Sequence, residues 1–123
     1  MCLLPHTRST ENILDLAVFR KLKRDGALGG AYLINAGRGK LQVDADIITA
    51  LDEGSLAGAT LDVFPNEPLS VDSPLWNRED ITITPHNAAV SVPTALVENV
   101  LRQIERLEAG LPLAHVVDRK VGY

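Results

Sequence analysis

The fold of this chain is decided by the stretch AYLINAGRG, residues 31–39. The apolar run at its start predicts a buried strand over residues 31–35. The glycines on either side of Arg38 predict a tight turn, because glycine adopts backbone angles that other residues avoid. In open α/β sheets, ligands bind outside the carboxyl ends of the strands, so an arginine on such a turn is a candidate ligand-binding residue.

The same pattern occurs twice more along the chain. Residues 59–62 form an apolar run that leads to Glu67, and residues 81–84 form a run that leads to His86. The loop between these two runs carries several prolines and is too long for a mere connection, which indicates a functional segment. We therefore expect Arg38, Glu67 and His86 to meet around one pocket at the edge of a sheet.

The segment between the first two predicted strands has the pattern of a helix. Apolar residues on one face predict a helix that has Asp44 as its N-cap and ends at Gly54. The next strand is expected over residues 56–63. Strand, helix and strand in this order form a βαβ unit with parallel strands. This geometry places Arg38 and Asp62 at the same edge of the sheet.

Two further helices are predicted on either side of this unit. A short helix is expected within residues 14–23, with Asp15 as its N-cap. The clearest helix of the chain covers residues 92–108, and Gly110 ends it. Its apolar stripe consists of Val92, Leu96, Val97, Val100, Leu101, Ile104 and Leu107.

Composition and charge exclude several classes of protein. Of the 123 residues, 46% are hydrophobic and 23% are charged, which is ordinary for a globular chain and excludes a disordered one. The net charge of -4 offers no basic field to nucleic acid or to an anionic membrane. One cysteine cannot form a disulfide framework, no Cys or His spacing resembles a metal site, and no apolar run is long enough to span a bilayer. We expect no nucleic-acid, membrane or metal partner, and a cytoplasmic location.

The beginning of the chain is unusual for a complete protein. Residues 2–4 are predicted to be the tail of a buried strand, and no strand, helix or glycine-rich turn precedes them. A fragment of a longer protein begins in this way, so we expect the chain to be a fragment.

Arg38 and His86 are the residues most suited to chemistry. Arginine presents a planar fork that matches a carboxylate with two hydrogen bonds. The alternative is a surface arginine paired with Asp44 or Glu67. Histidine titrates near neutrality and can give a proton to a carbonyl oxygen. The alternative for His86 is a buried histidine satisfied by backbone groups.

Two carboxylates could assist them. Glu67 near His86 would hold one tautomer of the ring and keep it protonated as an acid, whereas the alternative is a solvated loop glutamate. Asp62 ends its predicted strand and could accept a hydrogen bond from an amide of a ligand or cap local backbone donors. The residues by themselves leave both questions open.

Three motifs in order resemble the D-isomer-specific 2-hydroxyacid dehydrogenases. They are residues 33–39 followed by Val43-Asp44, residues 58–64 followed by Glu67-Pro68-Leu69 and Pro74-Leu75-Trp76, and Thr84-Pro85-His86-x-Ala88-Ala89. The ending, residues 117–123, is similar to the glyoxylate/hydroxypyruvate reductase A branch. The resemblance covers nearly the whole chain. It implies an α/β fold: the second half of a Rossmann-like parallel sheet with flanking helices and a long C-terminal helix.

The resemblance also implies a reaction and a cofactor. An NAD- or NADP-dependent oxidoreductase would reduce small 2-oxo acids such as glyoxylate or hydroxypyruvate to D-2-hydroxy acids, and the branch favours NADP. Arg38 would bind the substrate carboxylate, His86 would be the general acid and Glu67 its partner. Cofactor contacts would come from Asp62 at the nicotinamide carboxamide, from Pro5 and Thr10 on the adenosine side, and from Ala36, Gly37 and Ala88 at the nicotinamide.

The same comparison implies a division of the chain and shows departures from the family. Residues 1–90 would be the C-terminal half of a dinucleotide-binding domain, and residues 91–123 a helix and tail that return to a substrate domain in the family. The chain has no Gly-x-Gly-x-x-Gly turn and no substrate domain, while Asn87 and Arg8-Ser9 differ from the usual residues. We therefore expect the fragment to be inactive alone and the full-length protein to be a homodimer. The alternatives are a non-catalytic cofactor-sensing or assembly module on the same fold, or an inert piece of a split gene.

Overall fold

The computed structural model describes residues 1–89 and 91–122. The chain divides into two compact units, Met1–Ala88 and Ala89–Tyr123. The first unit carries the sheet and the second unit carries the long helix, and they are described in turn.

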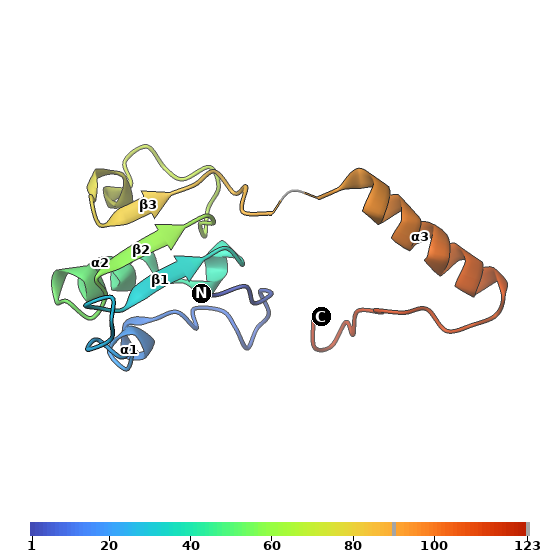
Figure 1. The fold of residues 1–123 in the computed structure, drawn as a ribbon, viewed down its shortest axis with the longest axis horizontal. Coiled ribbons are helices and arrows are strands. Elements are labelled where there is room, and N and C mark those ends of the chain that lie inside the picture. The colour runs from blue at the N-terminus through green and yellow to red at the C-terminus, as the bar shows by residue number, and fades with distance from the viewer. Residues whose placement is uncertain (90, 123) are drawn as a thin grey trace. The chain divides into compact units, whose positions relative to one another are not determined.

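The first unit contains a parallel sheet of three strands (Figure 1). The strands lie side by side in the order β1 (Tyr32–Asn35), β2 (Gly58–Leu61) and β3 (Ile81–Ile83). Both pairings are parallel. Cys2 adds an isolated parallel bridge to Asn35 at the free side of β1. The predicted α/β fold with a parallel sheet is confirmed.

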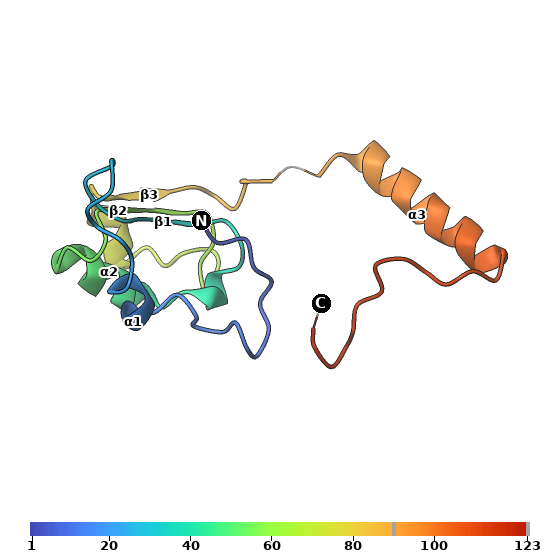
Figure 2. The same ribbon diagram turned by 60° about the horizontal axis from the view of Figure 1, so that its bottom comes forward.

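Both helices of this unit cover the same face of the sheet, as Figure 2 shows. They are α1 (Leu16–Phe19) and α2 (Asp44–Asp52). Phe19 from α1, Ile47 from α2 and Leu61 of β2 are fully buried in the same hydrophobic cluster. The alternation of side chains in β1 then leaves Tyr32 exposed on the other side of the strand.

The helix boundaries differ in part from those predicted. The Asp15 carboxylate accepts a hydrogen bond of 2.8 Å from the Val18 N–H, so its predicted role as N-cap is confirmed, but α1 forms only one turn. The predicted N-cap of α2 is wrong: Val43 occupies that position, and Asp44 is the first helical residue. The Asp44 carboxylate accepts a hydrogen bond of 2.8 Å from the Gln42 side chain instead.

Ion pairs brace the edge of the sheet at which the strands begin. Arg20 donates two hydrogen bonds of 2.9 and 2.7 Å to Glu53, at the ends of α1 and α2. Arg78 binds Asp52 at 2.6 Å and Asp80 at 2.7 Å just before β3. Bidentate pairs of this kind hold loop geometry more firmly than single surface contacts.

Two short 3-10 helices lie in the loops after the strands. The first, η1 (Gly39–Leu41), follows the turn that bears Arg38, and the second, η2 (Pro74–Asn77), lies between β2 and β3. Leu41 and Leu75 are buried within these elements. Both loops are therefore anchored to the core rather than free.

The second unit is built around the long helix α3 (Pro93–Glu108). The predicted helix is confirmed, with Val92 as its N-cap. Its apolar stripe is exposed in the described residues, with Leu96 54% and Leu107 64% exposed. The tail folds back along the helix, because the Ala114 N–H donates a hydrogen bond of 2.8 Å to the side chain of Gln103. Within the described part of the chain, no helix has the length and apolar character needed to cross a bilayer.

Candidate active site

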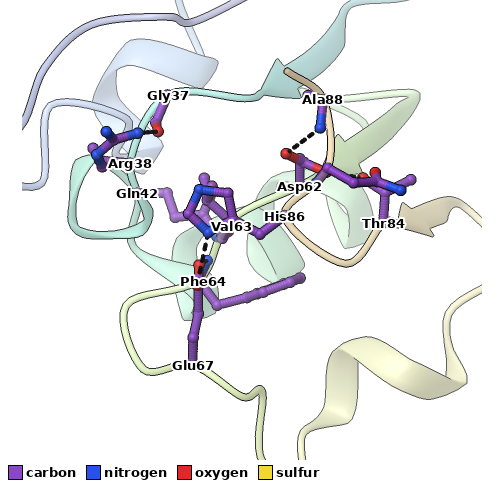
Figure 3. Close-up of polar contacts among 11 residues, drawn as sticks. Gly37, Arg38, Gln42, Asp62, Val63, Phe64, Glu67, Thr84, His86 and Ala88 are labelled. Carbon is purple, nitrogen blue, oxygen red and sulfur yellow. Dashed lines mark hydrogen bonds and ion pairs between the residues drawn. The ribbon is translucent and has the colours of Figure 1, made fainter. Parts of the chain in front are cut away.

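The carboxyl ends of the three strands carry the residues predicted to form the site. Arg38 follows β1, Asp62 and Glu67 follow β2, and His86 follows β3. Because the strands are parallel, all three exits lie at the same edge of the sheet. In Figure 3 the ring of His86 lies between Arg38 on one side and Asp62 on the other.

Glu67 and His86 form a hydrogen-bonded pair. Oε2 of Glu67 lies 2.8 Å from Nδ1 of His86, and Oε1 accepts a hydrogen bond of 2.9 Å from the backbone N–H of Phe64. The hydrogen bond with His86, and after it the one from Phe64, holds the pKa of Glu67 below its ordinary value. An ionised carboxylate only accepts hydrogen bonds, so Nδ1 carries a proton and Nε2 is the ring nitrogen left for a ligand.

The pair is half-buried, which decides between the alternatives for both residues. The side chain of His86 is 49% exposed and that of Glu67 37% exposed. His86 is therefore not a buried histidine held by backbone groups. Glu67 is not a freely solvated glutamate either, because each of its oxygens has a partner.

Asp62 anchors the chain directly after His86. It is 4% exposed, and its carboxylate accepts hydrogen bonds from the Thr84 hydroxyl at 2.5 Å, the Asn87 N–H at 2.9 Å and the Ala88 N–H at 3.0 Å. Burial raises the pKa of Asp62, but these hydrogen bonds outweigh burial and hold the pKa below its ordinary value. His86 has a φ of 53°, in the left-handed region. The two amides bound to Asp62 hold the backbone in that conformation.

Arg38 lines a cavity of about 280 Å³ together with the Glu67–His86 pair. The cavity is lined by His6, Arg38, Gly39, Lys40, Phe64, Pro65, Glu67 and His86. Nη1 of Arg38 donates a hydrogen bond of 2.7 Å to the carbonyl of Gly37. Within residues 1–89 and 91–122 the guanidinium makes no ion pair. The alternative of a pairing with Asp44 or Glu67 is therefore wrong, and the guanidinium is available to an anion.

A second cavity, of about 370 Å³, also borders Glu67 and His86. Its walls are mostly apolar and include Phe64, Leu69, Trp76 and Ile83, with Asp62 and Thr84 as polar groups. Apolar walls with a few well-placed polar groups are typical of sites for small organic molecules. The Glu67–His86 pair thus borders both cavities.

The remaining residues predicted to contact a cofactor lie along the same edge. The Thr10 hydroxyl donates a hydrogen bond of 2.8 Å to the carbonyl of Pro5, and the Ala36 N–H donates one of 3.2 Å to the carbonyl of Cys2. Gly37 packs on the first segment, because a Cβ there would lie 2.9 Å from the carbonyl oxygen of Leu4.

Ala88 is bound to Asp62 on the far side of His86, as Figure 3 shows. Contacts of Pro5, Thr10, Ala36, Gly37, Asp62 and Ala88 with a cofactor stay predictions. The part of the chain that the structure describes contains no group of three or more His, Cys, Asp or Glu side chains that could hold a metal ion.

Three polar residues of this region were not predicted as site residues. Thr84 binds Asp62, and the buried side chains of Asn35 and Gln42 bind each other at 2.7 Å beneath the turn that bears Arg38. The sequence contained one indication that Gln42 is buried, because it is a polar residue between the apolar residues Leu41 and Val43. Its partners on other segments could not be read from the sequence.

Comparisons with known proteins agree with this geometry. A probable 2-hydroxyacid dehydrogenase from Rhizobium etli CFN 42, in complex with NADP, HEPES and L(+)-tartaric acid, is 55% identical, with a TM-score of 0.89 over 98% of this chain and 38% of that chain. An NADPH-dependent glyoxylate/hydroxypyruvate reductase from Sinorhizobium meliloti, in complex with NADP and sulfate, is 52% identical, with a TM-score of 0.92 over 98% of this chain and 38% of that chain.

A third structure extends the comparison to a more distant relative. A D-isomer specific 2-hydroxyacid dehydrogenase from Xanthobacter autotrophicus Py2, in complex with NADPH and MES, is 39% identical, with a TM-score of 0.89 over 98% of this chain and 48% of that chain. The chain thus spans less than half the length of these relatives. Residues 1–88 match the family described as D-isomer specific 2-hydroxyacid dehydrogenase, NAD binding domain. The chain therefore belongs to the D-isomer specific 2-hydroxyacid dehydrogenases, an enzyme family that uses nicotinamide cofactors.

Proposed function

We propose that this chain supplies the proton donor and the carboxylate-binding arginine of an active site that reduces small 2-oxo acids, such as glyoxylate or hydroxypyruvate, to D-2-hydroxy acids. The observation that carries the proposal is the contact of 2.8 Å between Glu67 and His86 at a cavity that Arg38 also lines. These three groups provide what the reaction requires: a cation that binds the substrate carboxylate, a proton donor, and a group that orients the donor.

Arg38 binds the carboxylate of the substrate. Its guanidinium fork can form two parallel hydrogen bonds with the two carboxylate oxygens, which fixes the plane of the substrate as well as its position. In a 2-oxo acid the carbonyl group is bonded directly to the carboxylate. A carboxylate on Arg38 therefore brings the carbonyl oxygen into the cavity that His86 borders.

His86 donates the proton. Glu67 occupies Nδ1, so the proton of Nε2 is the one transferred to the carbonyl oxygen as the carbonyl carbon is reduced. The ring then returns to its neutral form, with the remaining proton on Nδ1 still bound to Glu67. The hydrogen bond from Nδ1 to Glu67 holds the orientation of the ring throughout.

The nicotinamide end of NADPH or NADH fits the residues on the far side of His86. When bound, the reduced cofactor supplies the hydride. Oδ2 of Asp62 accepts one hydrogen bond, from Ala88, and a carboxylate oxygen can accept a second, such as that of a carboxamide. The small side chains of Ala36 and Ala88 support close approach of a ring. The relatives crystallised with NADP or NADPH support NADPH as the preferred cofactor.

The pyrophosphate end of the cofactor has no glycine-rich partner in this sequence. The 123 residues contain no Gly-x-Gly-x-x-Gly turn, whose backbone N–H groups would hold the phosphates. We expect the isolated chain to bind NADPH weakly and to show no turnover. Titration calorimetry that gave micromolar affinity would contradict this expectation.

Association and location belong to the same proposal. The exposed apolar stripe of α3 supports burial against another protein surface, and we expect a homodimer in the full-length protein. A monomer in sedimentation would count against it.

The single cysteine, Cys2, is free and buried, which supports a reducing compartment such as the cytoplasm.

A chimera provides the test of the reaction. The chain is joined to the region of the Sinorhizobium meliloti reductase that lies outside its match, and oxidation of NADPH by glyoxylate is followed by absorbance. We expect turnover, and a loss of about 100- to 10,000-fold in kcat for His86→Gln. His115→Gln, in the tail, is the matched control and should keep full activity.

Three outcomes would count against the proposal. A folded chimera without turnover would refute it, and NADPH binding without turnover would favour the non-catalytic module. Full activity of the His86→Gln variant would refute the role of the proton donor.

A further inference from the structure

Two amide side chains are buried beneath the turn that carries Arg38. Asn35 is 0% exposed and Gln42 is 1% exposed. Oδ1 of Asn35 accepts a hydrogen bond of 3.1 Å from the Gly37 N–H, and Nδ2 lies 3.3 Å from the carbonyl oxygen of Arg38. Asn35 therefore ties down the backbone on both sides of the turn.

Gln42 connects this turn to the exit of β2. Its Oε1 accepts a hydrogen bond of 2.7 Å from Asn35, and its Nε2 donates to the Asp44 carboxylate at 2.8 Å and to the carbonyl of Val63 at 3.3 Å. Carbonyl and carboxylate oxygens only accept hydrogen bonds, so these partners determine which end of the Gln42 amide is oxygen and which is nitrogen. A buried amide with every group bonded fixes the distance between the segments that it joins.

The exit of β2 leads directly to the catalytic pair. Val63 is followed by Phe64, whose N–H binds Oε1 of Glu67 at 2.9 Å, and Oε2 of Glu67 binds His86 at 2.8 Å. A continuous series of hydrogen bonds and one peptide unit thus runs from the Arg38 turn through Gln42 to His86. The turn that bears Arg38 and the segments that bear Glu67 and His86 are the two arms of the site. Figure 3 shows Gln42 between them.

A steric contact supports the same connection independently. A Cβ at Gly39 would lie 1.9 Å from the backbone carbon and oxygen of Phe64. The turn that bears Arg38 therefore rests directly on the segment that bears Glu67, and the two segments can keep this contact only at one separation.

We propose that Gln42 is a positioning residue that sets the separation between Arg38 and the Glu67–His86 pair, and so matches the site to the short distance between the carboxylate and the carbonyl oxygen of a 2-oxo acid. The assignment to this substrate rests on the proposed function. The connection between the two arms stands on the contacts above and can be tested without a substrate.

The first test uses nuclear magnetic resonance on the 123-residue chain. Gln42→Met keeps the length of the side chain and removes its donor and acceptor. We expect shifts in the signals of the Arg38 side chain, the Phe64 N–H and the His86 ring. The control is Ser55→Ala, which removes another buried polar group, 2% exposed and bound to Glu53, near the start of β2. It should leave these three signals unchanged.

A second variant keeps the proposal testable if Gln42→Met fails to fold. Gln42→Glu has the same shape and keeps an acceptor for Asn35, but it replaces the donor to Val63 with an acceptor. We expect the signals of Phe64 and His86 to shift in this variant as well. Changes confined to residues 35–42, in either variant, would overturn the connection.

The second test uses the chimera and glyoxylate. Because a misplacement of about 1 Å can cost about 100-fold in rate, we expect Gln42→Met to lower kcat/KM by about 10- to 100-fold, with KM raised through Arg38 and kcat lowered through His86. A purely structural role would lower the melting temperature and leave both constants unchanged per folded molecule, which would overturn the proposal. A chimera without any activity would refute the proposed function, while the resonance test would still decide the connection.

Discussion

Replacement of Gly39 by alanine tests how closely the two arms of the site must pack. The new Cβ would lie 1.9 Å from the backbone of Phe64, and real Cβ atoms do not approach closer than 3.0 Å, so the two segments must separate by at least 1.1 Å. The obstacle is backbone and cannot rotate away as the end of a side chain could. The substitution therefore moves Arg38 away from Glu67 and His86.

The expected magnitudes follow from this displacement. Overpacking of a tight contact costs about 1–3 kcal/mol, and a backbone clash places Gly39→Ala near the upper limit, about 3 kcal/mol. In a domain of this size, 1 kcal/mol changes the melting temperature by about 4–8 °C, so we expect a decrease of about 12–24 °C. A displacement above 1 Å should also lower kcat/KM of the chimera by about 100-fold.

The assays are thermal unfolding of the chain, followed by circular dichroism, and oxidation of NADPH by the chimera. The matched control is Gly26→Ala, because a Cβ at Gly26 would have no atom within 4 Å. We expect the control to change stability by less than about 0.5 kcal/mol and to leave activity unchanged. The packing argument is refuted if Gly39→Ala melts at the same temperature as Gly26→Ala.

Three further predictions concern carboxylates. Asp62→Asn turns an amide NH2 toward the N–H of Ala88, so we expect a loss of about 2 kcal/mol and a melting temperature lower by about 8–16 °C; unchanged melting would contradict the anchoring role. Glu67→Gln removes the charge beside His86, and we expect kcat of the chimera to fall by about 10- to 100-fold while KM for glyoxylate stays the same; equal kcat values would count against the orienting role. Arg20 first, then Ser55, lower the pKa of Glu53 from 4.5 to about 2. The stability that Glu53 contributes is therefore present above pH 4.5 and is lost as the pH falls toward 2. Glu53→Gln should flatten this loss in melting curves, and identical pH profiles would refute it.

Local patterns were sufficient to predict most of the secondary structure. Apolar runs predicted the three strands, and the apolar stripe over residues 92–108 predicted α3, because the period of side chains along a strand or helix is a local property. Helix ends were predicted less well. Asp44 is a good N-cap residue by type, but its carboxylate is bound by Gln42, so the helix begins one residue earlier than that role requires.

The candidate site, too, could be predicted from the sequence only in part. The type and order of Arg38, Glu67 and His86 were visible in the sequence, and the parallel strands that bring them to one edge follow from the βαβ pattern. Two features of the site could not be predicted, because the alternatives for all three residues were chemically reasonable. They are the lack of an ion pair at Arg38 within the described residues and the contact of 2.8 Å between Glu67 and His86.

By itself, the sequence determined the family, the parallel arrangement of the strands and the residue types at their ends, since these depend on short motifs and on periodicity. Only the tertiary structure decided what Asp62 and Gln42 do. Asp62 binds the amides of Asn87 and Ala88, and Gln42 binds Val63, across gaps of more than twenty residues along the chain. Such partners are chosen by packing, since a buried polar group must be bonded to whichever segment the fold places beside it.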